Sequence, residues 1–237
     1  YMTTQLPDGA AIAGFIQKMV SKPNLNFQSA ALKAICICGD SPCFKMVVNH
    51  KMYVLFIMKI FRELNCSSAT PDNEKLLLHI IKALRLLCVN DDICDYCQCL
   101  GIFAKCKNVL MAYPVFIRQK GIEIFKLMER LFTCSTCRDS FADLGGIEPM
   151  VDILRNCYAN DVTAAEILKV LAVLAVDLNW VDFFISNKYI SMIVLRLIAG
   201  YHRQSMDCVI YCCTVLRELA EGSVAAALPI ALERGLE

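Results

Sequence analysis

The chain lacks a long uncharged stretch, is poor in glycine and proline, and carries almost no net charge. Its longest run without Asp, Glu, Lys or Arg is residues 222–232, whereas a membrane-spanning helix needs about 17–25 apolar residues. Ten glycines and seven prolines are too few for a collagenous or linker-like chain. Lys+Arg 24 against Asp+Glu 23 leaves no bulk charge for nucleic acid or an anionic bilayer. Membrane insertion and nucleic-acid binding are therefore not expected.

Apolar residues and cysteine are abundant instead. The 237 residues are 57% hydrophobic, which is enough for one large core or two small ones. The 15 cysteines cannot all pair within one chain, and free cysteine packs readily as a small hydrophobe. Reduced thiols and the lack of a secretory signal predict a cytoplasmic protein, with the nucleus as the alternative. A first residue other than Met and an end directly after a helix-like run indicate a fragment.

Apolar residues recur at helical spacing, and no segment alternates as a strand does. Leu168, Leu171, Leu174 and Ala175 follow steps of three and four residues, which is typical of one buried helix face. Turn-forming clusters interrupt the helical segments at residues 21–24, 69–73, 113–114, 159–161 and 201–204. Thr70 or Asp72, and Asn160 or Asp161, are the candidate helix N-caps. The sequence predicts an all-α fold.

Similar inner segments recur along the chain and define a repeat. They begin at Lys33, Lys82, Lys126, Lys169 and Thr214, so the steps are 82−33 = 49, 126−82 = 44, 169−126 = 43 and 214−169 = 45. An all-helical period in the forties is the range of armadillo and HEAT repeats.

The segment Leu144-Gly-Gly-Ile-Glu-Pro-Met-Val-Asp-Ile-Leu154 resembles the armadillo junction between a short first helix and a second helix. Pro149 stands where a first-turn proline is tolerated. Weaker copies lie at residues 100–103 and 8–12, and residues 50–53 and 187–190 lack the glycine, which leaves HEAT-like geometry open there.

The resemblance implies a right-handed α-solenoid superhelix of about five armadillo-like repeats in a single array over residues 1–237. The repeat bounds are expected at residues 1–49, 50–99, 100–144, 145–188 and 189–233, with a further repeat starting at residues 234–237. An array that ends without its stacking partner exposes an apolar face, so self-association through that end is expected.

In this family the third helices line a concave groove for extended partners. The tryptophan–asparagine ladder that holds nuclear-localisation peptides is absent, because those columns carry other residues here. One column reads Lys33, Lys82, Lys126 and Lys169, and the column four residues further on reads Ile37, Leu86, Arg130 and Val173. These eight residues are the predicted partner-binding set. Lysines at that position resemble those of the β-catenin type, which implies a protein or extended peptide with acidic and apolar residues.

Two cysteine pairs are the strongest sign of other chemistry. Cys94-x-x-Cys97 and Cys134-x-x-Cys137 have the spacing of zinc ligands, but the gap between the pairs is longer than usual. Both fall at the same place in adjacent repeats, whose helices should lie about 8–10 Å apart, so four converging thiolates are not expected. No metal or other cofactor is predicted. His50, His79 and His202 are scattered, and no phosphate-binding loop appears.

These observations favour a non-enzymatic scaffold or adaptor that holds a partner segment in its groove. Two alternatives remain open from the sequence. The chain could be a regulatory or autoinhibitory domain of a larger enzyme or signalling protein, and the paired cysteines could form a metal-dependent module.

Overall fold

The computed structural model describes residues 14, 16, 18, 25–39, 41, 50–64, 70–157, 161–223, 226, 227 and 230. All regular secondary structure in these residues is helical, which confirms the predicted all-α class. The helices are α2 (Leu25–Cys38), α4 (His50–Glu63), α5 (Pro71–Leu87), α6 (Asp91–Cys99), α7 (Ile102–Ala112), α8 (Pro114–Lys120), α9 (Ile122–Leu131), α10 (Ser135–Asp143), α11 (Ile147–Arg155), α12 (Asp161–Ala175), α13 (Leu178–Ser186), α14 (Tyr189–His202) and α15 (Met206–Gly222).

Local sequence signals set where helix α5 begins. The Thr70 hydroxyl accepts a hydrogen bond from the Asn73 backbone N–H at 3.3 Å, and Pro71 occupies the first helical position. Thr70 is therefore the N-cap, and Asp72 instead supplies negative charge in the first turn. Of the second pair of candidates, Asp161 is the first residue of α12, and Asn160 lies outside the described residues.

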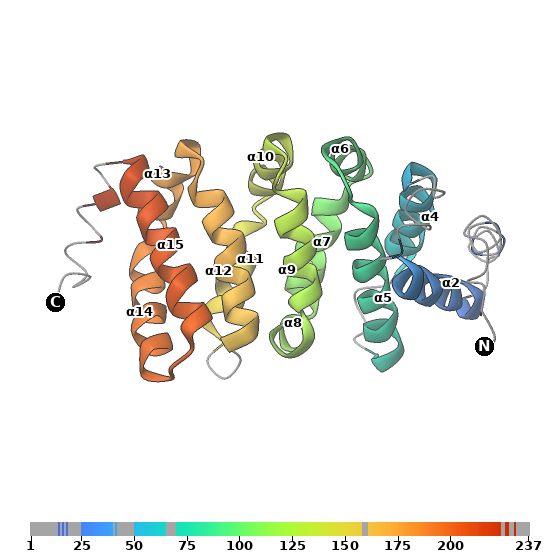
Figure 1. The fold of residues 1–237 in the computed structure, drawn as a ribbon, viewed down its shortest axis with the longest axis horizontal. Helices are drawn as coiled ribbons and strands as arrows, with labels where there is room; N and C mark the ends of the chain where they lie inside the picture. Colours follow the sequence, from blue (N-terminus) through green and yellow to red (C-terminus); the bar gives the residue numbers. More distant parts are fainter. Residues whose placement is uncertain are drawn as a thin grey trace, which may run out of the picture.

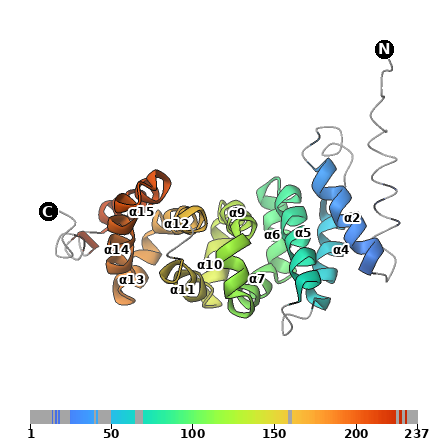
Figure 2. The same ribbon diagram turned by 90° about the horizontal axis from the view of Figure 1, so that it is seen from below.

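The helices stack in an elongated row (Figure 1). Helices α2, α5, α9, α12 and α15, here called the third helices, pack against one another in that order. Figure 2 shows the third helices along one edge of the row and α4, α7, α11 and α14 along the other. The row is bowed, so that the third helices lie on its inner side (Figure 2).

Polar contacts between neighbouring helices repeat the period that the sequence shows. The Lys107 ammonium donates to the Leu144 carbonyl at 2.6 Å, and Lys51 pairs with Asp92 at 2.9 Å. Many such contacts join residues that are between 36 and 47 positions apart. Each group of helices is thus bonded mainly to the next group along the chain, as expected for a repeat array.

Left-handed residues form three of the junctions that the sequence places between a first and a second helix. Gly145 (φ 65°) joins α10 to α11, and Gly101 (φ 76°) joins α6 to α7. Lys188 (φ 57°) makes the same turn between α13 and α14 without a glycine. Of the other two expected junctions, residues 8–12 lie outside the described residues, and α4 begins at His50 with residues 42–49 not described.

Exchanging side chains at two of these turns should change stability in opposite directions. A Cβ at Gly101 would meet no atom within 4 Å, so Gly101→Ala should lower the free energy of unfolding by about 1–2 kcal/mol through the backbone alone. Lys188→Gly should raise it by about 0.5 kcal/mol, because relief of the left-handed strain exceeds the entropy cost of glycine. Urea unfolding followed by circular dichroism measures both. A destabilised Lys188→Gly variant would contradict the assigned turn.

The segment between α7 and α10 forms two helices, whereas α5, α12 and α15 are each one long helix. Helix α8 ends at Lys120 and α9 begins at Ile122. A Cβ on the intervening Gly121 would lie 2.4 Å from the Ile117 carbonyl oxygen. Only glycine therefore allows the chain to close this tight bend.

Three phenylalanines fill the core where α7, α9 and α10 meet. Phe103, Phe132 and Phe141 are buried, with ring centroids 5.2–6.0 Å apart. A Cβ on Gly146 would lie 2.3 Å from the Phe141 ring. The second glycine of the junction is therefore required by packing, whereas Gly145 is required by its backbone conformation.

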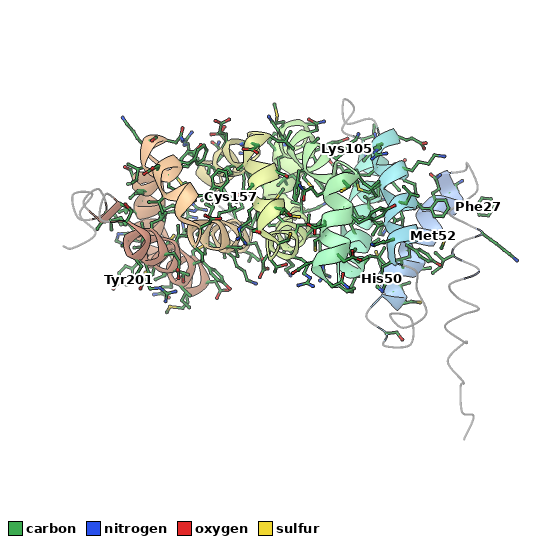
Figure 3. All side chains as sticks on the ribbon, turned by 90° about the horizontal axis from the view of Figure 1, so that it is seen from above. Phe27, His50, Met52, Lys105, Cys157 and Tyr201 are labelled. Atoms are coloured by element: carbon green, nitrogen blue, oxygen red, sulfur yellow. The ribbon has the colours of Figure 1, made fainter. Side chains whose placement is uncertain are left out.

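Exposed apolar side chains gather on the last two helices. Leu195, Ile198, Tyr201, Met206 and Ile210 are each at least 45% exposed, and Tyr201 projects from the edge of the row in Figure 3. Residues 228, 229 and 231–237, on which self-association was expected to depend, lie outside the described residues. Self-association stays a prediction.

No single described helix combines the length and apolar composition needed to cross a bilayer. The segments Trp180–Ser186 and Tyr189–His202 meet those criteria only as a pair, and they are bent by 78° with respect to each other.

Candidate functional site

The predicted lysine column lies on four successive third helices. Lys33 is exposed on α2, and Lys82, Lys126 and Lys169 are half-buried on α5, α9 and α12. Burial lowers the pKa of His79 on α5, and the charges of Lys33 and Lys82 lower it further. Both lysines are therefore near enough to the same imidazole to disfavour its charged form, as adjacent members of one column would be.

A cavity of about 570 Å³ lies beside the middle of this column. Helices α5, α9 and α12 supply its walls, so it opens on the side of the third helices. Its lining residues are Arg85, Leu86, Cys88, Val89, Lys126, Glu129, Arg130, Thr133 and Lys169. Five of these nine residues are charged at physiological pH and Thr133 carries a hydroxyl, beside apolar surface, which suits a partner with both polar and apolar side chains.

Acidic residues of α9 neutralise part of the basic charge. Arg85 lies 2.9 Å from Glu123, and Lys169 lies 3.0 Å from Glu129. Lys33, Lys82 and Lys126 form no ion pair with any described residue. The column is therefore not uniform, because Lys169 is already paired while the other three lysines keep their charge available.

Glu166 on α12 adds a third carboxylate near the column. Burial raises its pKa, whereas the charges of Lys126 and Lys169 act in the opposite direction. A half-buried carboxyl beside two ammonium groups reduces the attraction of the groove for acidic side chains at the α9–α12 step. The net positive charge is thus concentrated at the α2–α5–α9 end.

The apolar residues of the predicted set differ in how much surface they offer. Ile37 is 78% exposed, Leu86 only 9%, and Val173 packs partly against the core. Leu86 lines the cavity although it is buried, so it forms the floor, and a Cβ at Gly39 would lie 2.7 Å from its side chain. Val89, which the sequence reasoning missed, is 39% exposed on the same wall.

Arg130 has a structural task that the column did not suggest. Its Nε donates to the Cys88 carbonyl at 2.7 Å, and its terminal nitrogen donates to the Val89 carbonyl. These carbonyls follow the end of α5, where helical partners are missing. Arg130 therefore joins α9 to the end of α5, and it lines the groove while two of its nitrogen atoms donate to that backbone.

Sequence reasoning also missed Arg85, Glu123 and Glu129. Arg85 and Glu129 stand three residues after Lys82 and Lys126, and residues three apart lie on neighbouring positions of one helix face. Charged residues three positions after the column lysines could therefore have been included among the predicted groove residues. Their pairing, however, depends on how α5, α9 and α12 pack, which the spacing alone does not give.

The described cysteines are all free thiols, and most are buried. Burial raises the pKa of Cys36 to about 11 and those of Cys106 and Cys212 to about 12. These three thiols are therefore protonated at neutral pH and are weak nucleophiles. Cys88 and Cys97 lie with their sulfur atoms 3.6 Å apart in the core.

No protein-family model matches the chain, and no curated protein shows a similar sequence. The likeness to armadillo repeats therefore rests on the residues of the junctions and on the order in which the helices pack.

Proposed function

We propose that this chain is a non-enzymatic scaffold or adaptor with an armadillo-type, right-handed solenoid of repeats. The groove on its third helices would hold an extended segment of another protein. The observation that carries this proposal is the placement of Lys33, Lys82 and Lys126 on three consecutive third helices, beside a cavity of about 570 Å³. The number of free thiols supports a reducing compartment, the cytoplasm or the nucleus.

The spacing of the helices specifies the partner. Packed helices lie about 8–10 Å apart, and an extended peptide advances about 3.3 Å per residue. An acidic residue at about every third position would therefore meet successive lysines. Each exposed ion pair contributes only about 0.2–1 kcal/mol, so apolar side chains that contact Ile37, Leu86 and Val89 must supply most of the affinity.

Selection from a displayed library of random peptides tests this proposal. We expect enriched peptides to carry acidic residues about three apart with apolar residues between them. The variant Lys82→Glu/Lys126→Glu should bind the selected peptides about tenfold more weakly at low salt, because two attractive pairs become repulsive. Fluorescence anisotropy at increasing salt should show this difference shrinking.

The matched control is Lys59→Glu/Arg155→Glu, which makes the same change in formal charge on α4 and α11. Both side chains are exposed, and neither α4 nor α11 is a third helix. Its affinity should equal that of the parent chain. Equal weakening in both variants would assign the effect to net charge, and unchanged affinity in the Lys82→Glu/Lys126→Glu variant would refute the groove.

A further inference from the structure

Two helices from neighbouring groups bring three potential metal ligands together at the edge of the row. Asp95 lies on α6, Cys134 is the N-cap of α10, and Cys137 lies in the first turn of α10. Their ligand atoms all lie within 4.8 Å of one another, and the Cys134 sulfur is 3.0 Å from an Asp95 carboxylate oxygen. Within the part of the chain that the structure describes, this is the one such group.

The arrangement differs from the four-thiolate site that the sequence argues against. Cys97 packs toward Cys88, with 3.6 Å between the two sulfur atoms, and the Cys94 thiol donates to the Arg130 carbonyl at 3.8 Å. The first cysteine pair thus belongs to the core. Asp95 lies between Cys94 and Cys97 on α6 and is exposed, because both cysteines face the core. Asp95, and not the first cysteine pair, therefore lies beside Cys134 and Cys137.

The distances and the surroundings suit a tetrahedral ion. Zinc bonds of about 2.3 Å to sulfur and about 2.0–2.2 Å to oxygen place ligand atoms about 3.5–3.8 Å apart. The observed ligand atoms, all within 4.8 Å of one another, lie close to that spacing. The Thr136 hydroxyl donates to the Asp95 carboxylate at 2.9 Å, and the Gln98 amide oxygen lies 3.7 Å from the Cys137 sulfur. Such neighbours orient the ligands of metal sites.

We infer that Asp95, Cys134 and Cys137 form a zinc site with water in the fourth position. Two thiolates and one carboxylate suit Zn²⁺, whereas Ca²⁺ and Mg²⁺ take oxygen ligands only. Asp95 is exposed and Cys134 is half-buried, so the ion can enter from solvent. Binding replaces the two thiol protons, which leave to solvent, and the start of α10 favours the resulting thiolates.

The ion would link two neighbouring groups of helices through direct bonds to their side chains. Asp95 belongs to α6, and the two cysteines belong to α10. Because the ion binds the folded arrangement, it should stabilise that arrangement by an amount that rises with the logarithm of its concentration over the dissociation constant. The site lies beside α9, so the bound ion would also hold one side of the groove-forming helices in place.

Cobalt titration of the reduced, chelator-treated chain tests the site, since Co²⁺ replaces zinc and its thiolate complexes absorb light. We expect one equivalent of Co²⁺ to produce thiolate-to-cobalt charge-transfer absorption. Added Zn²⁺ should displace the Co²⁺ and remove that absorption. Cys134→Ser and Cys137→Ser should each abolish that absorption. Asp95→Asn should weaken binding at least tenfold, and Asp95→Cys should strengthen it and intensify the absorption. Zn²⁺ should raise the thermal midpoint of the parent chain but not of Cys134→Ser.

Exposed thiols elsewhere provide the matched controls. Cys99→Ser and Cys213→Ser should leave the cobalt spectrum and the zinc-dependent midpoint unchanged. Circular dichroism of each variant without metal shows whether it folds, and Asp95 is exposed enough for Asp95→Asn to fold normally. The site is refuted if one equivalent of Co²⁺ gives no charge-transfer band. It is also refuted if the band survives in Cys134→Ser or depends on Cys94 and Cys97 instead.

Discussion

Replacing Phe132 with alanine should lower the free energy of unfolding by about 3–5 kcal/mol. The ring is fully buried at the end of α9, and its centroid lies 5.2 Å from that of Phe141 and 6.0 Å from that of Phe103. Truncation removes apolar contact and leaves a cavity among two rings that cannot collapse without moving α7 or α10. Urea unfolding followed by circular dichroism measures the loss.

Two companion variants separate packing from other causes. Phe132→Leu keeps much of the volume and should lose distinctly less stability than Phe132→Ala. Tyr201→Ala removes a ring of similar size that is 71% exposed, so it should change stability by no more than about 0.5 kcal/mol. Similar losses for Phe132→Ala and Tyr201→Ala would contradict the assigned core.

Replacing Arg130 with methionine should lower the free energy of unfolding by about 1.5–3 kcal/mol, the usual range for hydrogen bonds that involve a charged group. The guanidinium donates to the Cys88 and Val89 carbonyls, and methionine leaves both without that donor while keeping most of the side-chain length. Arg130→Lys should recover only part of the loss, because one ammonium cannot match two carbonyls as the planar fork does.

The control for this variant is Arg155→Met. Arg155 forms an exposed ion pair with Asp152 three residues away, and such pairs contribute about 0–1 kcal/mol. Equal losses for Arg130→Met and Arg155→Met would show that Arg130 does not hold the end of α5. A loss of stability in Arg130→Met would also affect how its peptide binding is interpreted. Weaker binding by that variant would then reflect both a disturbed groove and a lost contact with the peptide.

The helix junctions could be predicted from the sequence where they contain glycine. Glycines marked two of the junctions in the sequence, because Gly101 and Gly145 have a left-handed backbone and Gly146 lies too close to the Phe141 ring for a side chain. Lys188 makes the same turn with no such signal. A non-glycine residue adopts that conformation only where the surrounding structure holds it there, and the surrounding structure is not visible in a local pattern.

The candidate zinc site could be recognised from the sequence only in part. Both cysteine pairs were visible in the sequence, but the structure places Cys97 beside Cys88 and brings Asp95 in place of the first pair to Cys134 and Cys137. Asp95 could not be chosen among the many acidic residues of the chain. Its partnership with Cys134 and Cys137 depends on how α6 lies against α10, at a sequence separation of 39 for the Asp95–Cys134 contact.

The sequence by itself determined the helical class, the repeat period and the third-helix position of Lys33, Lys82, Lys126 and Lys169, because helical spacing and turn chemistry act over a few residues. Only the tertiary structure decided which of these lysines keep their charge available, that Arg130 holds the end of α5, and that Leu86 is the floor of the groove. Those outcomes follow from contacts about one repeat apart, and small shifts in helix packing decide which side chains reach each other.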